Sequence, residues 1–530
     1  MPARTLPRRA FLEFLGIGIA SVLVAQCFPL KQKKEPKISW KPIPPSDLDR
    51  LELAVGYRYE LLIRWNDPIS AYDHFGFNND FMAFIPLDRN QLNDGFLWVN
   101  HEYPDARFIS GYFRQNDTKK TREQVDKELY EVGGTVLRVR LEHHKWHVVK
   151  DDPLNRRLHG LTEIPFNWNE PIAGSRSAIG TVGNCAGGVT PWGTFLTCEE
   201  NYDLFYGERD FESGKRITYD GDFEWHQYYD YPPEHYGWVV EVDPRTGAAQ
   251  KHVALGRCAH ECATVKELPD GRVVVYTGDD ANDQCLYKFI SSTPSSLSEG
   301  VLYVANLDEG RWIPIDHAQQ ALLQKHFRNQ TETLIRLREA DHLLGGTSLD
   351  RPEDIDINPV NGDVLVTLTN NLSRGNYTGS ILKIIEKDGK YDALEFRSET
   401  FLTGGPETGF ACPDNMAFDP AGNLWFTSDI SGAAMNNEDY PQYLPFKNNS
   451  LFVVPIKGDQ AGQVIRIANA PTGAEFTGPL FSPDGKSLFL SVQHPGENTP
   501  SPDQVNSHWP DGGSSMPKPA VVVIYGDFTA

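Results

Sequence analysis

One short pattern recurs along this chain: a glycine in a turn, followed at once by an apolar strand. The turn at Asp270-Gly271 precedes Arg-Val-Val-Val-Tyr-Thr, and the turn at Ala421-Gly422 precedes Asn-Leu-Trp-Phe-Thr. The six turn glycines are Gly95, Gly193, Gly271, Gly362, Gly422 and Gly485. Hairpins repeated at such intervals are typical of a propeller, in which each blade is a small antiparallel sheet and insertions lengthen some blades. The sequence therefore predicts an all-β, six-bladed β-propeller.

The segments between these hairpins support the same fold class. Most are short strands rich in Val, Ile, Phe, Tyr and Trp, and the 45 glycines and 37 prolines indicate many turns. Residues 105–130 and 202–236 are charged or aromatic without the repeat, so we expect insertions there. A hairpin near 243–247 is expected to be an outer strand pair of a neighbouring blade. Residues 316–340 predict a short helical segment, with apolar residues at helical spacing: Leu323, Phe327, Leu334 and Leu337.

Each hairpin also carries acidic or thiol side chains at comparable positions. The innermost strand of a propeller blade runs along the central channel, so the first residues of all inner strands meet at one mouth. At these positions, 8 to 10 residues before the turn glycine and 15 before Gly95, stand Asp80, Cys185, Glu261, Glu353, Asp414 and Glu475. The returning strands end at the same mouth with Glu102, Glu199, Glu200, Asp279, Asp280, Asp429 and His494. The spacing thus predicts an acidic ring at one end of the channel.

Such a ring is expected to bind cations. Carboxylates held close together repel one another unless they are protonated or neutralised. Carboxylate oxygens suit Ca²⁺ or Mg²⁺, and a thiolate at Cys185 suits a softer ion such as iron or zinc. The alternative is an acidic rim that only keeps the channel hydrated.

Arg351 adds a cation to this ring. The fork of donors on a guanidinium binds phosphate at two points. Pro352 is expected to hold Arg351 in an extended conformation, so that Arg351 and Glu353 face the channel together. The alternative role for Arg351 is a structural salt bridge to Glu353 or Asp354.

Other motifs exclude some classes of function. The net charge of −22 disfavours nucleic acid as a partner. Gly187-Gly188 is interpreted as a pair of turn glycines outside the strand–helix context of a phosphate loop. Cys258 and Cys262 flank His260-Glu261 and are either part of a metal site or buried strand residues.

The first residues predict export. Arg8-Arg9 precedes an apolar stretch, Phe14–Ala25, that is shorter than the roughly 20 residues of a membrane-spanning helix. We interpret residues 1–26 as a twin-arginine signal peptide and 27–530 as one propeller domain, exported by the Tat machinery to the periplasm or beyond. The alternatives are an N-terminal anchor helix, or a lipid anchor at Cys27, for which Gln26 is a poor match.

Several segments, taken together, resemble the PhoX family of bacterial alkaline phosphatases. They are Gly56-Tyr57-Arg58-Tyr59, Phe77-Asn78-Asn79-Asp80, Trp98-Val99-Asn100-His101-Glu102-Tyr103, Gly183-Asn184-Cys185-Ala186-Gly187-Gly188, Cys198-Glu199-Glu200-Asn201, His260-Glu261, Arg351-Pro352-Glu353-Asp354 and Phe481-Ser482-Pro483-Asp484-Gly485. The resemblance extends from about Trp40 to Gly496.

This resemblance implies a monomeric phosphatase that acquires phosphate from small phosphomonoesters, with Fe³⁺ and Ca²⁺ in its channel. It implies that Cys185 and Glu200 bind iron, that Glu261, Glu353 and Glu475 are further ligands, and that Arg351 holds the phosphate. Two other functions remain open. One is a calcium-dependent propeller hydrolase of another ester class, lactonase-like or phosphodiesterase; the other is a non-catalytic metal-binding propeller.

The export signal generates the first testable prediction. A chain carrying both Arg8→Lys and Arg9→Lys should accumulate as precursor in the cytoplasm, because the Tat route requires the arginine pair. Fractionation and immunoblotting measure this, with the unchanged chain as control. Normal export of the double variant would contradict the twin-arginine interpretation.

Overall fold

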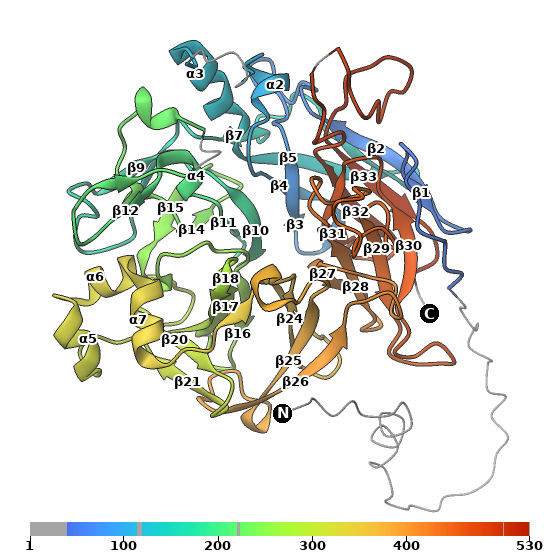
Figure 1. Cartoon of the computed structure of the whole chain (residues 1–530). Coiled ribbons are helices and arrows are strands. Elements are labelled where there is room, and N and C mark those ends of the chain that lie inside the picture. Colours follow the sequence, from blue (N-terminus) through green and yellow to red (C-terminus); the bar gives the residue numbers. More distant parts are fainter. Residues whose placement is uncertain (1–39, 114–118, 220–222, 502, 529–530) are drawn as a thin grey trace, which may run out of the picture. The chain divides into compact units, whose positions relative to one another are not determined.

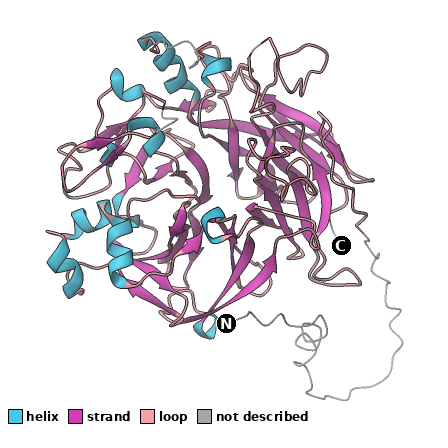
Figure 2. Cartoon of the chain, in the orientation of Figure 1, coloured by secondary structure: helices cyan, strands magenta, loops and turns pink. Residues whose placement is uncertain are grey.

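The computed structural model describes residues 40–113, 119–219, 223–501 and 503–528. Within them six antiparallel sheets fan out around a common centre (Figure 1), and strands far outnumber helices (Figure 2). The all-β, six-bladed propeller predicted from the hairpins is confirmed. The proposed signal peptide at 1–26 lies outside the described residues.

The first three blades follow chain order from the inside outward. Blade 1 consists of β3 (Asn79–Asp88), β4 (Gln91–His101), β5 (Gly133–Glu142), β6 (Lys145–Val148) and β7 (Arg156–Leu158), the last paired with β5. Blade 2 consists of β10 (Asn184–Val189), β11 (Phe195–Glu199), β14 (Val239–Val242) and β15 (Ala249–His252). Blade 3 consists of β16 (Thr264–Glu267), β17 (Val273–Gly278), β19 (Leu286–Ser291), β20 (Gly300–Asn306) and β21 (Arg311–Pro314).

The other three blades complete the ring. Blade 4 consists of β23 (Pro352–Ile357), β24 (Val364–Leu368), β25 (Ser380–Glu386) and β26 (Phe396–Thr403). Blade 5 consists of β27 (Pro413–Phe418), β28 (Leu424–Ser428), β29 (Ser450–Val454), β30 (Ile465–Asn469) and β1 (Glu52–Leu53). Blade 6 consists of β31 (Glu475–Phe481), β32 (Ser487–Gln493), β33 (Ala520–Tyr525) and β2 (Arg58–Arg64). Early strands β1 and β2 thus form the outer edges of blades 5 and 6.

Smaller elements decorate the blades. The short sheets pair β8 (Glu163–Pro165) with β9 (Ser177–Ile179), β12 (Glu208–Arg209) with β13 (Arg216–Ile217), and β18 (Asn282–Gln284) with β22 (Leu349–Asp350). Single helical turns are η2 (Trp225–Gln227), η3 (Pro233–His235), η4 (Val253–Leu255), η5 (Leu372–Arg374) and η6 (Lys387–Gly389). No helix in the described ranges is long and apolar enough to cross a membrane.

Five of the six predicted turn glycines do occupy turns between the first two strands of a blade. Gly193, Gly271, Gly362, Gly422 and Gly485 all have the positive φ that glycine adopts without a steric penalty. The prediction for Gly95 was wrong. This glycine lies inside β4 opposite Pro86, and a Cβ there would meet the Ile85 carbonyl oxygen at 2.5 Å, so it permits close packing instead.

Gly187-Gly188 was also misinterpreted, because both residues lie in strand β10 instead of a turn. A Cβ on Gly187 would stand 2.1 Å from the Leu196 carbonyl oxygen, and one on Gly188 would stand 2.0 Å from the Ala263 carbonyl oxygen. The second contact joins neighbouring blades close to the channel. Glycine is therefore needed where inner strands converge.

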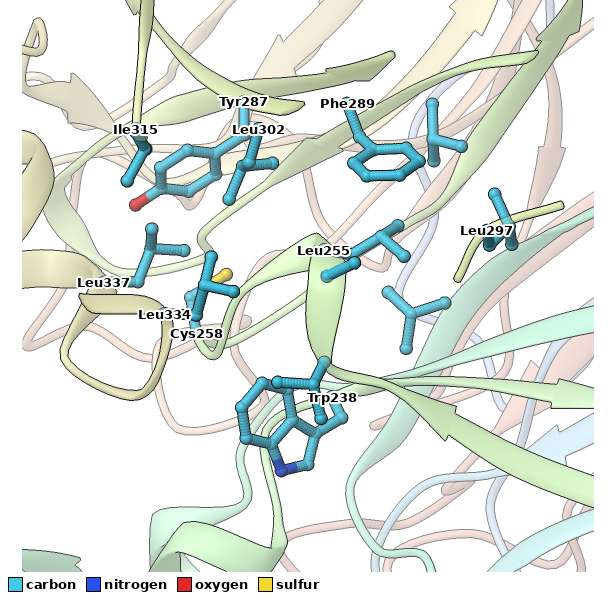
Figure 3. Close-up of a cluster of buried hydrophobic side chains, with 14 of the residues drawn as sticks. Trp238, Leu255, Cys258, Tyr287, Phe289, Leu297, Leu302, Ile315, Leu334 and Leu337 are labelled. Atoms are coloured by element: carbon cyan, nitrogen blue, oxygen red, sulfur yellow. The ribbon is translucent and has the colours of Figure 1, made fainter. Parts of the chain in front are cut away.

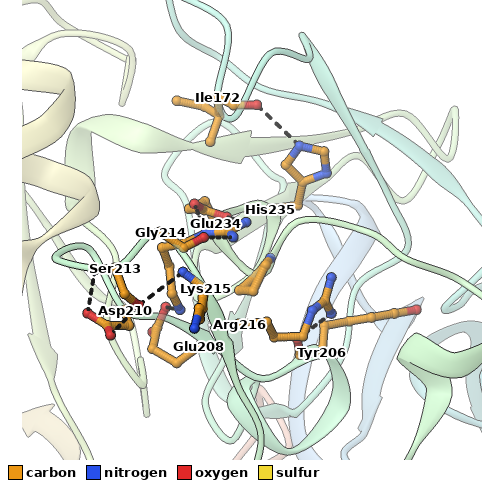
Figure 4. Close-up of polar contacts among 12 residues, drawn as sticks. Ile172, Tyr206, Glu208, Asp210, Ser213, Gly214, Lys215, Arg216, Glu234 and His235 are labelled. Atoms are coloured by element: carbon orange, nitrogen blue, oxygen red, sulfur yellow. Dashed lines mark hydrogen bonds and ion pairs between the residues drawn. The ribbon is translucent and has the colours of Figure 1, made fainter.

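Both predicted insertions lie outside the repeating blades. The first contains α2 (Ala106–Ile109) and α3 (Arg122–Glu131), and the second contains α4 (Asp203–Tyr206) with β12 and β13. They share one aromatic cluster that includes Phe205, Tyr206 and Trp225. Polar contacts stabilise the second insertion. They include the ion pair of Arg209 with Glu234 at 2.8 Å and the hydrogen bond that the Ser213 hydroxyl donates to Asp210 at 2.5 Å (Figure 4). The hairpin at 243–247 joins β14 to β15, an outer strand pair as expected.

The helical segment forms three short helices instead of one. These are α5 (Ala321–His326), α6 (Gln330–Ile335) and α7 (Leu337–Leu344). Asn329 caps α6, and Arg336 leaves helical geometry with φ −102° and ψ 45°. The periodicity nevertheless identified the buried face, since Leu334 and Leu337 enter the largest apolar cluster (Figure 3).

Close approach at Gly188 leads to a stability prediction. Gly188→Ala should lower the free energy of unfolding by about 1–3 kcal/mol, because the added methyl group meets a backbone oxygen that cannot rotate away. Denaturant unfolding measures the change. Glu267→Ala, at the exposed far end of β16, is the control and should stay within about 0.5 kcal/mol. Equal stability of the two variants would refute the account.

Candidate functional site

The six inner strands converge on a polar cavity of about 200 Å³ at one mouth of the channel. Its walls include eight of the ten predicted site residues: Asp80, Glu102, Cys185, Glu200, Arg351, Glu353, Asp414 and Glu475. The other two touch this set directly. The Cys185 Sγ lies 3.2 Å from Glu261 Oε1, and Asp280 accepts hydrogen bonds from Arg351 at 2.8 and 2.9 Å.

The same backbone feature precedes several of these side chains and directs them toward the channel mouth. Five of the candidate ligands lie two residues after a position with left-handed φ: Asn78, Gly183, Arg351, Cys412 and Gly473 precede Asp80, Cys185, Glu353, Asp414 and Glu475 respectively. A left-handed residue reverses the chain direction sharply, which brings the next residues into the channel mouth.

A β-bulge follows in four of the same strands. In blade 4, Pro352 pairs with Leu368 but Ile355 pairs with Val366, so one extra residue stands on the inner strand beside Glu353. The same shift occurs between Asn79 and Met82, between Asn184 and Gly187, and between Pro413 and Met416. Bulges release a residue from the regular ladder and redirect its side chain. The repeat thus presents Asp80, Cys185, Glu353 and Asp414 to one centre.

Seven of the ring side chains fall into groups whose ligand atoms lie close enough together to share a cation. Three groups each offer three ligand atoms that all lie within 4.8 Å: Asp80 with Glu102 and Cys185, Cys185 with Glu200 and Glu261, and Glu261 with Asp280 and Glu353. The groups share members, so together they form a continuous chain of ligands across the mouth.

Burial and mutual repulsion make this cluster electrostatically costly. Burial, followed by the charges of Glu353 and Glu200, raises the pKa of Glu261 well above its ordinary value. Burial and the nearby Asp429 raise the pKa of Asp414 to about 8. Burial also raises the pKa of the Cys185 thiol, with Asp80 the next cause. As protein groups alone, these acids resist ionisation.

Arg351 is the one cation among the walls of this cavity that is always charged. Its guanidinium pairs with Asp280 at 2.8 Å and Glu353 at 2.7 Å, and its Nη1 lies 3.9 Å from Asp429. Burial would raise the pKa of Asp280, but the charge and hydrogen bonds of Arg351 outweigh it and hold that pKa below its usual range. One guanidinium cannot neutralise the whole ring.

The expected conformation of Arg351 was wrong. Its φ is 55°, in the left-handed region, although Pro352 follows it. Such backbone is strained for a residue before proline and is found mainly at functional sites. Arg351 still faces the channel with Glu353, so the predicted placement holds for a different reason: the sharp turn, not strand alternation, directs it inward.

Two residues at the ends of returning strands point elsewhere. Glu199 is buried in an ion pair with Lys251 at 2.6 Å, and Asp279 pairs with Arg338 at 2.6 Å. Their neighbours Glu200 and Asp280 face the ring instead, since successive side chains of extended backbone point in opposite directions. Cys258 and Cys262 are buried, free and packed among apolar side chains, although neither lies in a strand as the second interpretation expected.

Sequence reasoning missed the neutral residues that orient the ring. Gln493 and Asn201 donate hydrogen bonds to Glu102 at 2.6 and 3.3 Å, and the Thr369 hydroxyl donates to Glu353 at 2.8 Å. All three lie beside the ends of returning strands, so the spacing that found Glu102 and Glu200 could have found them.

The residues present fit bound cations. The carboxylate oxygens Asp80 Oδ1 and Glu261 Oε2 are buried and have no hydrogen-bond partner among the described residues. Buried acceptors normally have a partner, and these two face a cluster of like charge. Hard oxygen donors with one thiol form a donor set that suits a hard cation beside a softer one.

The family model described as "Alkaline phosphatase PhoX" matches residues 38–496. The chain belongs to the PhoX family of alkaline phosphatases. It is accordingly a phosphomonoester hydrolase, and the family and activity expected from the sequence are confirmed. The roles of individual residues stay predictions.

One solved structure shows the same relationship. PhoX from Pseudomonas fluorescens, in complex with vanadate as a transition-state analogue, is 29% identical, with a TM-score of 0.81 over 92% of this chain and 98% of that one. A gluconolactonase from Xanthomonas campestris is 12% identical, with a TM-score of 0.35 over 93% of this chain and 99% of that one. A comparison with curated protein sequences gave no match.

Charge repulsion in this PhoX site predicts that two similar substitutions change the free energy of unfolding in opposite directions. In protein kept in chelator, Asp414→Asn should raise the free energy of unfolding at pH 8 by about 0.5–3 kcal/mol, the usual range for point substitutions. The raised pKa of Asp414 means that ionisation opposes folding as the pH rises from about 4 toward about 8. The gain should therefore vanish near pH 4.

Asp280→Asn is the matched control. The pKa of Asp280 is held low by Arg351, so its charge stabilises the fold, and the substitution should destabilise the same chelator-treated protein at pH 8. Thermal unfolding at both pH values measures the two effects. A loss of stability in both variants at pH 8 would contradict the repulsion argument.

Proposed function

We propose that the acidic ring of this PhoX-family phosphatase holds Fe³⁺ and Ca²⁺, and that Arg351 binds the phosphoryl group of a small-molecule phosphomonoester. The observation that carries the proposal is a buried ring of carboxylates and one thiol around a single guanidinium in one 200 Å³ cavity. Bound cations remove the repulsion within the ring, and a guanidinium at its edge attracts a phosphate dianion.

The donor types suggest how the ligands divide. One group combines a sulfur with two carboxylates, which suits iron: Cys185, Glu200 and Glu261. Glu261, Asp280 and Glu353 offer only oxygen, which suits calcium. Asp80, Glu102, Asp414 and Glu475 complete the ring as further carboxylate ligands. When bound, such ions supply Lewis acidity toward the phosphoryl group and lower the pKa of water.

Arg351 is arranged to stabilise the transition state. Its Nε and Nη2 are engaged by Asp280, and Nη2 also by Glu353, which fixes the plane of the guanidinium. Nη1 lies beyond hydrogen-bond distance of Asp429, so this edge can donate to a phosphoryl oxygen. Hydrolysis transfers the phosphoryl group from the alcohol oxygen to water, through a transition state whose charge is spread over the three equatorial phosphoryl oxygens. A preorganised donor is most effective at that stage.

Location and assembly complete the proposal. The Arg8-Arg9 pair supports Tat export of the folded protein to the periplasm or beyond, with a lipid anchor at Cys27 as the alternative. A monomer that releases inorganic phosphate from small esters outside the cytoplasm would serve phosphate acquisition.

Paired substitutions test the roles of cation and ligand. Arg351→Ala should retain the metals, because arginine is no ligand, yet lose roughly 10²–10³ in turnover of a chromogenic phosphomonoester. Glu353→Gln should lose bound metal together with activity. Elemental analysis, melting temperature and turnover of the unchanged protein and both variants are the measurements. The salt-bridge alternative predicts lower stability of Arg351→Ala with near-normal turnover of the folded fraction.

Two outcomes would overturn the proposal. Wild-type turnover of Arg351→Ala would remove this residue from the active site. A fully active preparation with neither iron nor calcium would remove the metals.

A further inference from the structure

A second, larger chamber opens beside the acidic ring. Its volume is about 630 Å³, against about 200 Å³ for the ring cavity. The two cavities are adjacent, because they share four lining residues: Tyr103, Asn201, His494 and Glu497. A phosphoryl group held at the ring would therefore direct the rest of its ester toward the chamber.

Both insertions build the chamber wall, outside the repeating blades. From the first insertion α2 contributes together with Tyr112, Phe113 and Lys120, and from the second α4 contributes with Phe223. Figure 1 labels α2 and α4. The apolar lining consists mainly of Tyr103, Tyr112, Phe113, Leu204, Phe205 and Phe223. The rings of Phe205 and Phe223 lie 4.6 Å apart, and the backbone N–H of Phe223 donates to the Leu204 carbonyl at 2.8 Å, which joins these side chains into one wall.

The cations of the wall are already engaged. Arg107 pairs with Asp105 and donates to the backbone carbonyls of Glu497 and Thr499, which ties α2 to the loop at 497–499. Lys120 is buried in an ion pair with Glu128 at 2.6 Å.

The net charge of the lining also disfavours anions. Two of the lining side chains are always cationic, Arg107 and Lys120, against three carboxylates: Asp105, Glu224 and Glu497. The histidine of the lining, His494, is engaged by Glu475 at 3.3 Å. A second negative charge on a ligand would meet no unengaged cation in the described wall. An apolar or aromatic group would instead contact rings and aliphatic side chains.

We infer that this chamber is the leaving-group subsite, and that it selects phosphomonoesters of apolar or aromatic alcohols without further negative charge. The inference rests on the proposed function, since it requires the phosphoryl group at the ring. Because the inserted segments form the chamber, it accounts for substrate preference separately from the catalytic ring.

Two esters with similar alkoxide leaving groups isolate the contribution of the chamber. The metal-loaded protein should cleave 2-phenylethyl phosphate with a kcat/KM about 10- to 100-fold above that for ethyl phosphate, the range that an apolar pocket can discriminate. A para-carboxylate on the phenyl ring should remove most of this preference. Leu204→Ala should reduce the ratio of the two kcat/KM values several-fold, and Leu204→Asp should reduce it to near one.

Ile217→Ala is the matched control, because Ile217 is an exposed apolar residue of the same insertion and is not part of the chamber lining. Its ratio should equal that of the unchanged protein, and melting temperatures verify that each variant is folded. A ratio near one in the unchanged protein, or an unchanged ratio in folded Leu204→Asp, would overturn the inference alone. Failure to cleave either ester would overturn the proposed site itself, and this inference with it.

Discussion

The mutual repulsion of buried carboxylates at the centre of the propeller is the constraint on which this structure depends. Six inner strands converge there, and nearly every one brings an acid or a thiol to the same mouth. A single guanidinium, that of Arg351, offsets only part of the charge. The rest of the molecule must hold the ring closed against this repulsion, and the blades do so with extensive apolar packing between sheets. The same repulsion that weakens the isolated protein is what makes the site attractive to multivalent cations.

Glycine residues and left-handed backbone conformations allow the inner strands to converge and their side chains to point into the channel. Inner strands approach so closely that Gly188 has no room for a methyl group against the neighbouring blade. Side chains that follow regular strand alternation would point into the blades, as Glu199 does. The turn before the strand and the bulge after it redirect Glu353 and its equivalents toward the axis. One local device, repeated from blade to blade, thus builds a site from residues that lie hundreds of positions apart.

Much of this arrangement could be predicted from the sequence, because the repeated hairpins indicate both the number of blades and the positions at which each inner strand begins. Five turn glycines and the strand pair around Gly95 indicated six blades, and counting back from the turn glycines located Cys185 and Glu353. What could not be predicted depends on tertiary contacts. Gly95 resembles a turn glycine but packs inside β4, the helical segment breaks at Arg336, and Arg351 adopts a left-handed conformation that proline disfavours in short peptides. Neutral partners such as Thr369 carry no charge, so only their position beside the ends of returning strands could have pointed to them.

The pairing of β2 with β33 has a consequence for synthesis on the ribosome. Strand β2 cannot pair until residues 520–525 have been synthesised, so blade 6 is incomplete until then. Strand β1 likewise cannot pair before β30 of blade 5 has been synthesised. The nascent chain therefore cannot complete the ring of six blades until translation is nearly finished. The acidic ring, drawn from every blade, is therefore complete only after nearly the whole polypeptide has been synthesised.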